Sequence, residues 1–337
     1  MIKKFFKSHP VHRDIVKHLD VIFLFRPVFF FAVWVMVCIG MLFAIQDLAG
    51  TIHEVWFDSF SFNTLLFFTG LTLFIGSLLI INQMDDIESD KKNKKLMLVD
   101  NKISISLASD IQRYSLYLSA VIICLSDFAI LPFFFLIYYI WGVLYNDSRY
   151  NGKGRPIVGL AINALSGLVL ILMGWAYVHD LNGSSYWPMM IDVDIFIKAL
   201  PYILCYSAIS ILSTIPDKDG DKLIDKRTFS LEYGNSRSIL ISAVLVLAVI
   251  VISLWIGPTD TLIAHASVCS FPFFIYALFR GLEKDIVRAI RYPVFLLNFF
   301  TSIYFPYLSL AVVLVYFISK YYYWHRFDLH YPALAMD

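Results

Sequence analysis

Residues 65–90 read LLFFTGLTLFIGSLLIINQMDDIESD, an apolar run that passes directly into a polar and acidic segment. The apolar part, residues 65–81, extends outward to the roughly 20 residues that a helix needs to cross a hydrocarbon core of about 30 Å. The whole chain shares this bias, since 59% of its 337 residues are hydrophobic and 16% are charged. Soluble domains carry about 25% charged residues. The composition therefore excludes a water-soluble enzyme, a disordered chain and a disulfide scaffold, and we expect an all-α, polytopic membrane protein.

Apolar runs of similar length recur along the chain and define the other predicted helices. Residues 105–145 are too long for one span and are interpreted as two helices that meet near Asp127. The remaining predicted spans are residues 28–45, 157–178, 195–215, 238–256, 262–279 and 294–319. The prediction is therefore a bundle of nine transmembrane helices in a single domain, residues 1–337.

Lys and Arg residues occupy alternate loops of this prediction. Residues 1–17, 91–113, 149–155, 218–237 and 280–291 contain five, six, three, five and four of them, and the intervening loops contain none. Positive loops favour the cytoplasmic side, so we expect the N-terminus and the basic loops inside and the C-terminal tail outside. The loop composition favours a prokaryotic plasma membrane. No basic domain or zinc signature indicates nucleic acid as a partner, and no obligate protein partner is evident.

Two acidic clusters lie where predicted helices end on the cytoplasmic side. The first contains Asn82, Asp86 and Asp90, and the second contains Asp217, Asp221 and Asp225. A spacing of four places each set on one helix face, where like charges repel. Acids are also disfavoured at helix C-termini, and ionisable groups at membrane depth are costly. Two such clusters in equivalent places indicate a bound counter-charge rather than a solvated loop. An EF-hand is excluded because no closing Glu follows.

The expected counter-charge is Mg²⁺, which binds oxygen ligands through one or two carboxylates and completes its shell with water and phosphate oxygens. Two facing carboxylate walls can hold roughly two or three Mg²⁺ ions around one diphosphate. Arg26 lies near the inner end of the first span, where it can reach a diphosphate or extend to the lipid headgroups.

At these residues the sequence resembles the UbiA-type intramembrane prenyltransferases. The resemblance rests on the two aspartate motifs, on Lys226-Arg227-Thr228 and Gly234, on Arg26-Pro27, and on Tyr145 with Lys153. It implies a nine-helix bundle with a central cavity capped by cytoplasmic loops. By this resemblance the catalytic aspartates are Asp86, Asp90, Asp217 and Asp221, and with Asn82 they form the metal and diphosphate set. By the same resemblance, Tyr145 and Lys153 are expected to contact the diphosphate or to shape its exit.

The sequence departs from the family pattern in three places. Asn93-Lys94 is present after the first motif, but Lys95-Leu96-Met97-Leu98 replaces the usual Arg-Pro pair, so that Lys94 or Lys95 is expected to supply this charge to the diphosphate. Asp225 stands where many members carry Gly, as a supplementary ligand or an exposed residue. Asn146-Asp147-Ser148 replaces the usual prolines after Tyr145.

The leading hypothesis is a prenyltransferase that moves an isoprenoid from an allylic or polyprenyl diphosphate to a lipophilic, aromatic acceptor. Mg²⁺ assists the loss of diphosphate, the bilayer excludes water from the resulting carbocation, and aromatic rings stabilise it. A membrane terpene cyclase or lyase would begin with the same ionisation and need no acceptor. A transporter of divalent cations or phosphorylated lipids is disfavoured because the acids gather at one membrane face.

Overall fold

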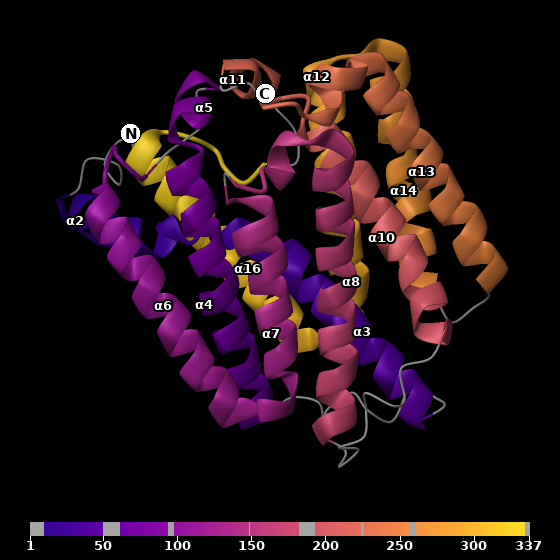
Figure 1. Ribbon diagram of the computed structural model, residues 1–337, viewed down its shortest axis with the longest axis horizontal. Helices are drawn as coiled ribbons and strands as arrows, with labels where there is room; N and C mark the ends of the chain where they lie inside the picture. Colours follow the sequence, from indigo (N-terminus) through magenta and orange to yellow (C-terminus); the bar gives the residue numbers. More distant parts are fainter. Residues whose placement is uncertain are drawn as a thin grey trace.

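The computed structural model describes residues 10–49, 61–93, 98–147, 149–181, 193–223, 226–256 and 261–333. Long helices run side by side through the molecule, and the shorter helices gather at one end of them (Figure 1). No strand is formed by the described residues, and the isolated bridge between Val99 and Ile103 is the only β pairing among them. The predicted all-α class is therefore confirmed.

The first half of the bundle is built from α3 (Phe30–Ala49), α4 (Phe62–Asp85), α6 (Ile105–Ser126), α7 (Leu131–Ile137) and α8 (Pro156–Leu181). The helix α4 packs along α6, and α3 packs along α8. Gly40 and Gly174 permit the second of these contacts, because a Cβ on either would overlap the backbone of the facing helix. The predicted break near Asp127 is present, since α6 ends at Ser126 and a short 3-10 helix, η3 (Phe128–Ile130), follows.

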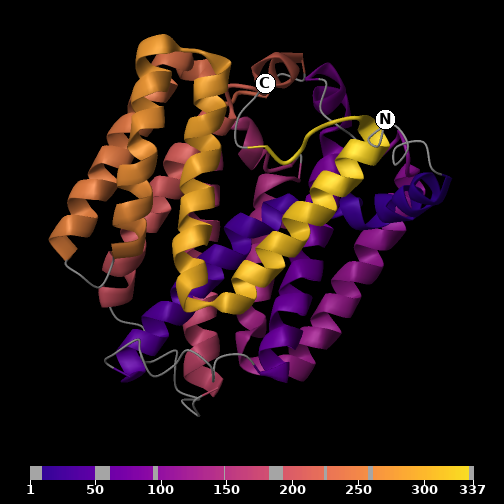
Figure 2. The same cartoon turned by 180° about the vertical axis from the view of Figure 1, so that it is seen from behind.

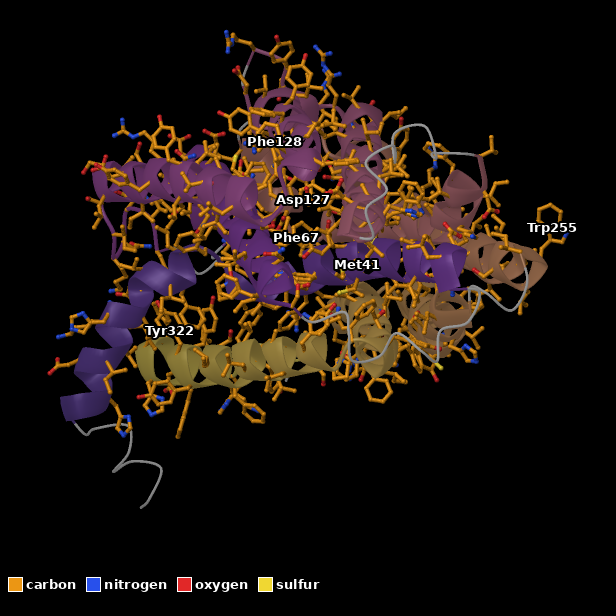
Figure 3. The ribbon with its side chains drawn as sticks, turned by 90° about the horizontal axis from the view of Figure 1, so that it is seen from below. Met41, Phe67, Asp127, Phe128, Trp255 and Tyr322 are labelled. Carbon is orange, nitrogen blue, oxygen red and sulfur yellow. The ribbon has the colours of Figure 1, made fainter. Side chains whose placement is uncertain are left out.

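The second half consists of α10 (Val193–Ser213), α13 (Asn235–Ile256), α14 (Thr261–Arg280) and α15 (Glu283–Tyr304), each packed against the next. Its outer surface is apolar. On α13 the exposed side chains include Val244, Leu247, Val251 and Leu254, which recur at helical spacing. Trp255 points away from the bundle, whereas Met41 and Phe67 lie inside it (Figure 3). An apolar outer surface around a packed interior is the arrangement expected in lipid.

Eight helices among the described residues are long and apolar enough to cross a membrane. The predicted count of nine is not confirmed, because α6 forms a long helix but does not belong to these eight. The prediction of an integral membrane protein stands on the eight that do.

The predicted last span is wrong. Residues 294–319 do not form one helix, because the chain breaks at Phe305 between α15 and α16 (Pro306–Phe327). Pro306 has no backbone N–H and so fits the start of a new helix. The basic segment 280–291 was predicted as a loop, but from Glu283 onward it forms the first turns of α15.

The predicted position of the C-terminal tail is also wrong relative to the N-terminus. From the far end of the bundle, α16 runs back to α2 (Pro10–Leu24), so that both ends of the described chain lie on the same side (Figure 2). Tyr322 of α16 lies beside α2 (Figure 3). The error has one source: the apolar run hides the break, and one missed reversal moves the tail to the opposite face.

Candidate active site

The first acidic motif lies at the junction of α4 with a short helix, α5 (Ile87–Lys92). Asp86 occupies the junction with φ −97° and ψ 15°, and its N–H donates to Asn82 O at 3.0 Å. The Asp90 N–H in turn donates to Asp86 O at 2.8 Å, so successive motif residues are linked by backbone hydrogen bonds across the junction. Asp86 and Asp90 are buried, although both are ionisable.

The second acidic motif follows α10 and enters α11 (Lys218–Leu223). The Asp221 N–H donates to Asp217 O at 3.0 Å, which places the two residues one helical turn apart. Asp221 is buried, Asp217 is half-buried, and Asp225 lies outside the described residues.

The two motifs are held together by contacts between α5 and α11 (Figure 1). Asn93 joins them directly: its Nδ2 donates to Asp217 O at 3.0 Å, and its Oδ1 accepts from the Gly220 N–H at 2.7 Å. Ser89 Oγ also donates to Asp221 Oδ1 at 3.5 Å. The close approach requires Gly220, because a Cβ there would lie 2.4 Å from Ser89 O. Residues 124 and 132 positions apart in the chain thus form a single site.

Three motif aspartates each form an ion pair with a cation, and two of these cations, Lys153 and Arg26, come from distant parts of the chain. Lys153 Nζ lies 3.0 Å from Asp86 Oδ1, in a loop that contains a short helix, η5 (Gly152–Gly154). Arg26 Nη2 lies 3.1 Å from Asp90 Oδ2, and Lys226 Nζ lies 3.4 Å from Asp221 Oδ1. Such pairing offsets the cost of burying a carboxylate.

The charge of Lys226 depends on both motifs. Burial of this side chain disfavours its charged form, but the carboxylates of Asp86 and Asp221, with Tyr145, outweigh burial and raise the pKa of Lys226 above its ordinary value. Lys226 is therefore charged at neutral pH, within the electrostatic reach of both motifs.

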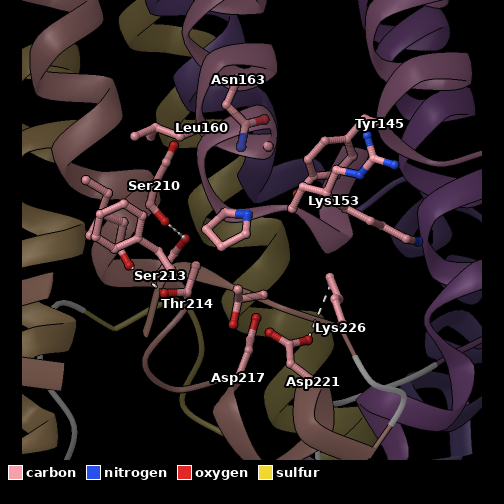
Figure 4. A pocket seen from close by; sticks show the side chains of 16 residues that line it. Tyr145, Lys153, Leu160, Asn163, Ser210, Ser213, Thr214, Asp217, Asp221 and Lys226 are labelled. Carbon is pink, nitrogen blue, oxygen red and sulfur yellow. Dashed lines mark hydrogen bonds and ion pairs between the residues drawn. The ribbon is translucent and has the colours of Figure 1, made fainter. Parts of the chain in front are cut away.

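A pocket of about 110 Å³ opens beside the second motif. Asp217, Asp221 and Lys226 lie on one side of it, with Lys153 and Tyr145 on another and Asn163 of α8 farther in (Figure 4). Tyr145 ends a π-helical segment, η4 (Tyr138–Tyr145), which continues α7. Asp86 does not line the pocket but is bonded to Lys153, which does. The pocket combines carboxylates, cations and hydroxyl groups, the set that binds a metal-complexed phosphate.

The donor set fits a Mg²⁺ ion that completes its coordination with water and phosphate oxygens. Within the described ranges, no three His, Cys, Asp or Glu side chains are grouped closely enough to enclose an ion alone. One or two carboxylates from each motif are what Mg²⁺ takes when a substrate completes its coordination. Asp86 and Asp90 would hold an ion on one side, with the Asn82 amide, and Asp217 and Asp221 on the other.

The structure brings together most residues singled out in the sequence. Asn82 Nδ2 donates to Asp86 Oδ2 at 2.9 Å and to Asn146 Oδ1 at 3.2 Å, while Tyr145 and Lys153 line the pocket. Arg26 reaches the first motif but does not line the pocket. Lys94 and Lys95 lie outside the described residues.

Sequence reasoning did not assign a role to Lys226, Asn93 or Asn146. Lys226 follows Asp221 by five residues in a segment that resembles the family, which was the available signal. Asn93 carried a signal of the same kind, as part of the Asn93-Lys94 pair after the first motif, whereas Asn146 stands where the sequence departs from the family pattern. Neither signal indicated the contact that each residue makes with a residue distant in the chain.

The fold and the site define a helical membrane protein in which two aspartate motifs and their paired cations meet at one end of the bundle. The profile of the UbiA prenyltransferase family matches residues 33–299, and the chain belongs to this family. A comparison with curated proteins finds no match.

Solved structures with the same fold include a UbiA homologue from Archaeoglobus fulgidus. Its complex with GPP and Mg²⁺ has a TM-score of 0.63 and 15% identity, covering 88% of this chain and 99% of that one. Its complex with DMAPP and Mg²⁺ has the same values. A structure described as digeranylgeranylglyceryl phosphate synthase has a TM-score of 0.51 and 18% identity, covering 88% of this chain and 98% of that one. These likenesses show the shared fold.

Proposed function

We propose that this protein is an intramembrane prenyltransferase that joins the isoprenoid of an allylic diphosphate to a lipophilic acceptor. The observation that carries the proposal is the convergence of two aspartate motifs and three paired cations at one end of an apolar helical bundle. Membership of the UbiA prenyltransferase family supports it, as do the GPP and DMAPP complexes of the Archaeoglobus fulgidus homologue. The basic loops indicate that the site faces the cytoplasm.

The proposed reaction begins with cleavage of the allylic C–O bond. The diphosphate leaves with the bonding electron pair, and Lys153 and Lys226 neutralise the charge that develops on it. Asn82, Asp86, Asp90, Asp217 and Asp221 would hold Mg²⁺, which would supply further Lewis-acid stabilisation of the leaving diphosphate. Because each cation is held by an aspartate in the structure, the substrate replaces an existing ion pair instead of meeting a flexible charge.

The remaining allylic carbocation must meet the acceptor before it meets water. Apolar helices surround the bundle interior, so bulk water has little access to it. The Tyr145 ring lies in the pocket wall, where a π-face can stabilise a cation by roughly 0.5–2 kcal/mol. We expect the acceptor to be aromatic: a ring carbon attacks the cation, and the ring then loses a proton. Asn163, deeper in the pocket, offers a polar contact for its substituents.

The experiment is to incubate the purified protein in lipid with Mg²⁺ and a panel of allylic diphosphates, with and without a membrane lipid extract. Diphosphate release and products are followed by mass spectrometry. Release that depends on the extract, with a product of acceptor plus prenyl mass, is the expected result. Release without the extract, giving a hydrocarbon or terpene alcohol, would replace the proposal by a cyclase or lyase. No release from folded protein would contradict both and favour a transporter.

A further inference from the structure

Two helices outside the segment matched by the family pack against each other beside the first acidic motif. The match covers residues 33–299, which includes neither α2 nor α16. The two helices nevertheless contact each other, and α16 also contacts the short helix η1 (Pro27–Phe29) that leads into α3 (Figure 2). The two ends of the chain thus form a packed unit outside the residues that the family profile matches.

The contact is fixed by a buried charged group. Asp20 of α2 is 6% exposed. Its Oδ1 accepts from Tyr322 Oη at 2.6 Å and from Arg326 Nε at 3.1 Å, and its Oδ2 accepts from Arg326 Nη2 at 2.7 Å. The Arg326 fork is therefore bidentate, the geometry that gives an ion pair strength and direction. The Phe23 and Tyr322 rings stack beside it at 3.8 Å. We call these four residues the clasp.

The clasp lies next to Arg26, the cation that pairs with Asp90 of the first motif. Arg26 lies two residues after the end of α2 and has the left-handed backbone conformation, φ 50° and ψ 61°, immediately before Pro27. That conformation is unfavourable for a residue with a side chain and persists only where the surroundings impose it. Here the Arg26 N–H donates to Phe23 O at 3.0 Å, so a clasp residue itself fixes the turn.

The turn directs the Arg26 side chain to Asp90. Nη2 of Arg26 bonds to Asp90 Oδ2, and the two side chains are 17% and 5% exposed. From the other side, Tyr323 of α16 and Tyr331 of the tail lie close enough to Arg26 to interact with it electrostatically. An unbroken series of contacts therefore joins Arg326, through Asp20 and the turn, to a proposed metal ligand.

We propose that Asp20 and Arg326 are positioning residues, which hold Arg26 against Asp90 and thereby set the first motif for the metal–diphosphate complex. The inference rests on the proposed function of that site. It assigns a role to α2 and α16, which lie outside the residues matched by the family profile. Small displacements of a binding group are costly, since an error of about 1 Å can reduce turnover about 100-fold.

The test is a double-mutant cycle on the full chain in lipid nanodiscs, with calorimetric binding of inorganic diphosphate in the presence of Mg²⁺ as the first readout. Arg26→Gln is expected to weaken binding about 10- to 100-fold, because it removes a charge-assisted bond to Asp90. Arg326→Gln is expected to weaken it about 10-fold in the wild-type background and not at all in the Arg26→Gln background. Arg326→Lys, which keeps the charge, should restore most of the affinity.

Two further variants distinguish a positioning role from a loss of binding caused by unfolding. Tyr322→Phe removes one bond to Asp20 without removing a charge, and its effect, about threefold, should also vanish in the Arg26→Gln background. Asp14→Asn is the matched control, because Asp14 lies on the same helix and pairs with Lys17 in an exposed position. It should bind as the wild type does. Thermal unfolding of each variant shows which of them are folded.

The positioning role of the clasp and the proposed function of the site can fail separately. If the effects of Arg326→Gln and Arg26→Gln multiply, the clasp does not act through Arg26 and the positioning role is wrong, whatever the reaction. If the wild-type protein binds Mg²⁺–diphosphate but converts no allylic diphosphate, the proposed function fails, and the binding cycle still decides the role of the clasp. If the wild-type protein does not bind Mg²⁺–diphosphate, both proposals are overturned.

Discussion

Replacing Asp86 by Asn removes a charge from the centre of the site with almost no change in volume. Asp86 is 9% exposed, and its carboxylate accepts hydrogen bonds from Lys153 Nζ at 3.0 Å and from Asn82 Nδ2 at 2.9 Å. An Asn at this position can still accept the second bond. The first loses its ionic character, which costs about 1.5–3 kcal/mol at most. Lys153 also retains Asp85, 3.8 Å away, so we expect the folded state to survive.

The expected effect of Asp86→Asn on turnover is larger than its effect on stability. The variant loses a proposed ligand for the metal that neutralises the departing diphosphate. It also removes the carboxylate charge with which Lys153 pairs. Removing one preorganised group that stabilises developing charge costs about 10²–10³ in kcat, or roughly 2.7–4 kcal/mol. We therefore expect kcat to fall at least 100-fold, while the midpoint of thermal unfolding falls by only a few degrees.

The assay for Asp86→Asn measures kcat and KM for an allylic diphosphate, together with thermal unfolding, in lipid nanodiscs. Asp110→Asn is the control, because Asp110 forms an exposed ion pair with Arg113 on α6. It makes the same chemical change away from the site and should leave kcat unaltered. A folded Asp86→Asn protein whose kcat is within about threefold of the wild type would remove Asp86 from the proposed machinery.

Three further predictions address the junction, the metal and the opposite end of the bundle. Gly220→Ala should reduce turnover and destabilise the protein by about 1–3 kcal/mol in denaturant unfolding, since its Cβ overlaps Asn93 and Ser89. Gly142→Ala is the control, because its Cβ would make only ordinary van der Waals contacts; equal effects of the two substitutions would contradict the role of Gly220 at the junction of the motifs. Chelation of divalent ions should abolish turnover and added Mg²⁺ should restore it, whereas activity that survives exhaustive chelation would exclude the metal role of the aspartates. Burial, opposed by the Ala129 N–H and reinforced by Asp180, raises the pKa of Asp127 to about 6. The contribution of Asp127 to the free energy of unfolding is therefore complete below its unfolded pKa of about 3.9 and is lost as the pH rises through about 6. Asp127→Asn should abolish this pH dependence of unfolding between about pH 4 and 7.

The helical class and the position of the acidic motifs could be predicted because both depend on local sequence. A long apolar run forms a membrane helix almost irrespective of its neighbours, and acids at the end of such a run stand out. The break at Phe305 could not be found in this way, because the residues on both sides of it are apolar. Pro306 was the available signal, but a proline can also lie inside a membrane helix, as Pro201 does in α10.

The contacts that complete the site depend on tertiary structure. Asn93 is an ordinary polar residue after a helix until α11 brings Gly220 to its side chain. The same holds for Asp20 and Arg326, which are separated by 306 residues and would each be interpreted as a surface charge. Spacing along the chain identifies carboxylates that share a helix face, but it does not identify the cations that pair with them.

The pairing of charges explains why a divalent ion is needed for this site to accept its substrate. Asp86, Asp90 and Asp221 are each paired with a cation, namely Lys153, Arg26 and Lys226, so these cations already compensate buried carboxylates of the site. A diphosphate entering this group would add negative charge where burial already makes charge costly. A cation that turns to the substrate gives up its ion pair with a buried carboxylate, which is costly. Divalent ions resolve both conflicts at once, since they compensate the aspartates and the diphosphate together and free the cations for the leaving group. Diphosphate affinity should therefore rise steeply with Mg²⁺ concentration, and an affinity that is independent of Mg²⁺ would refute this account.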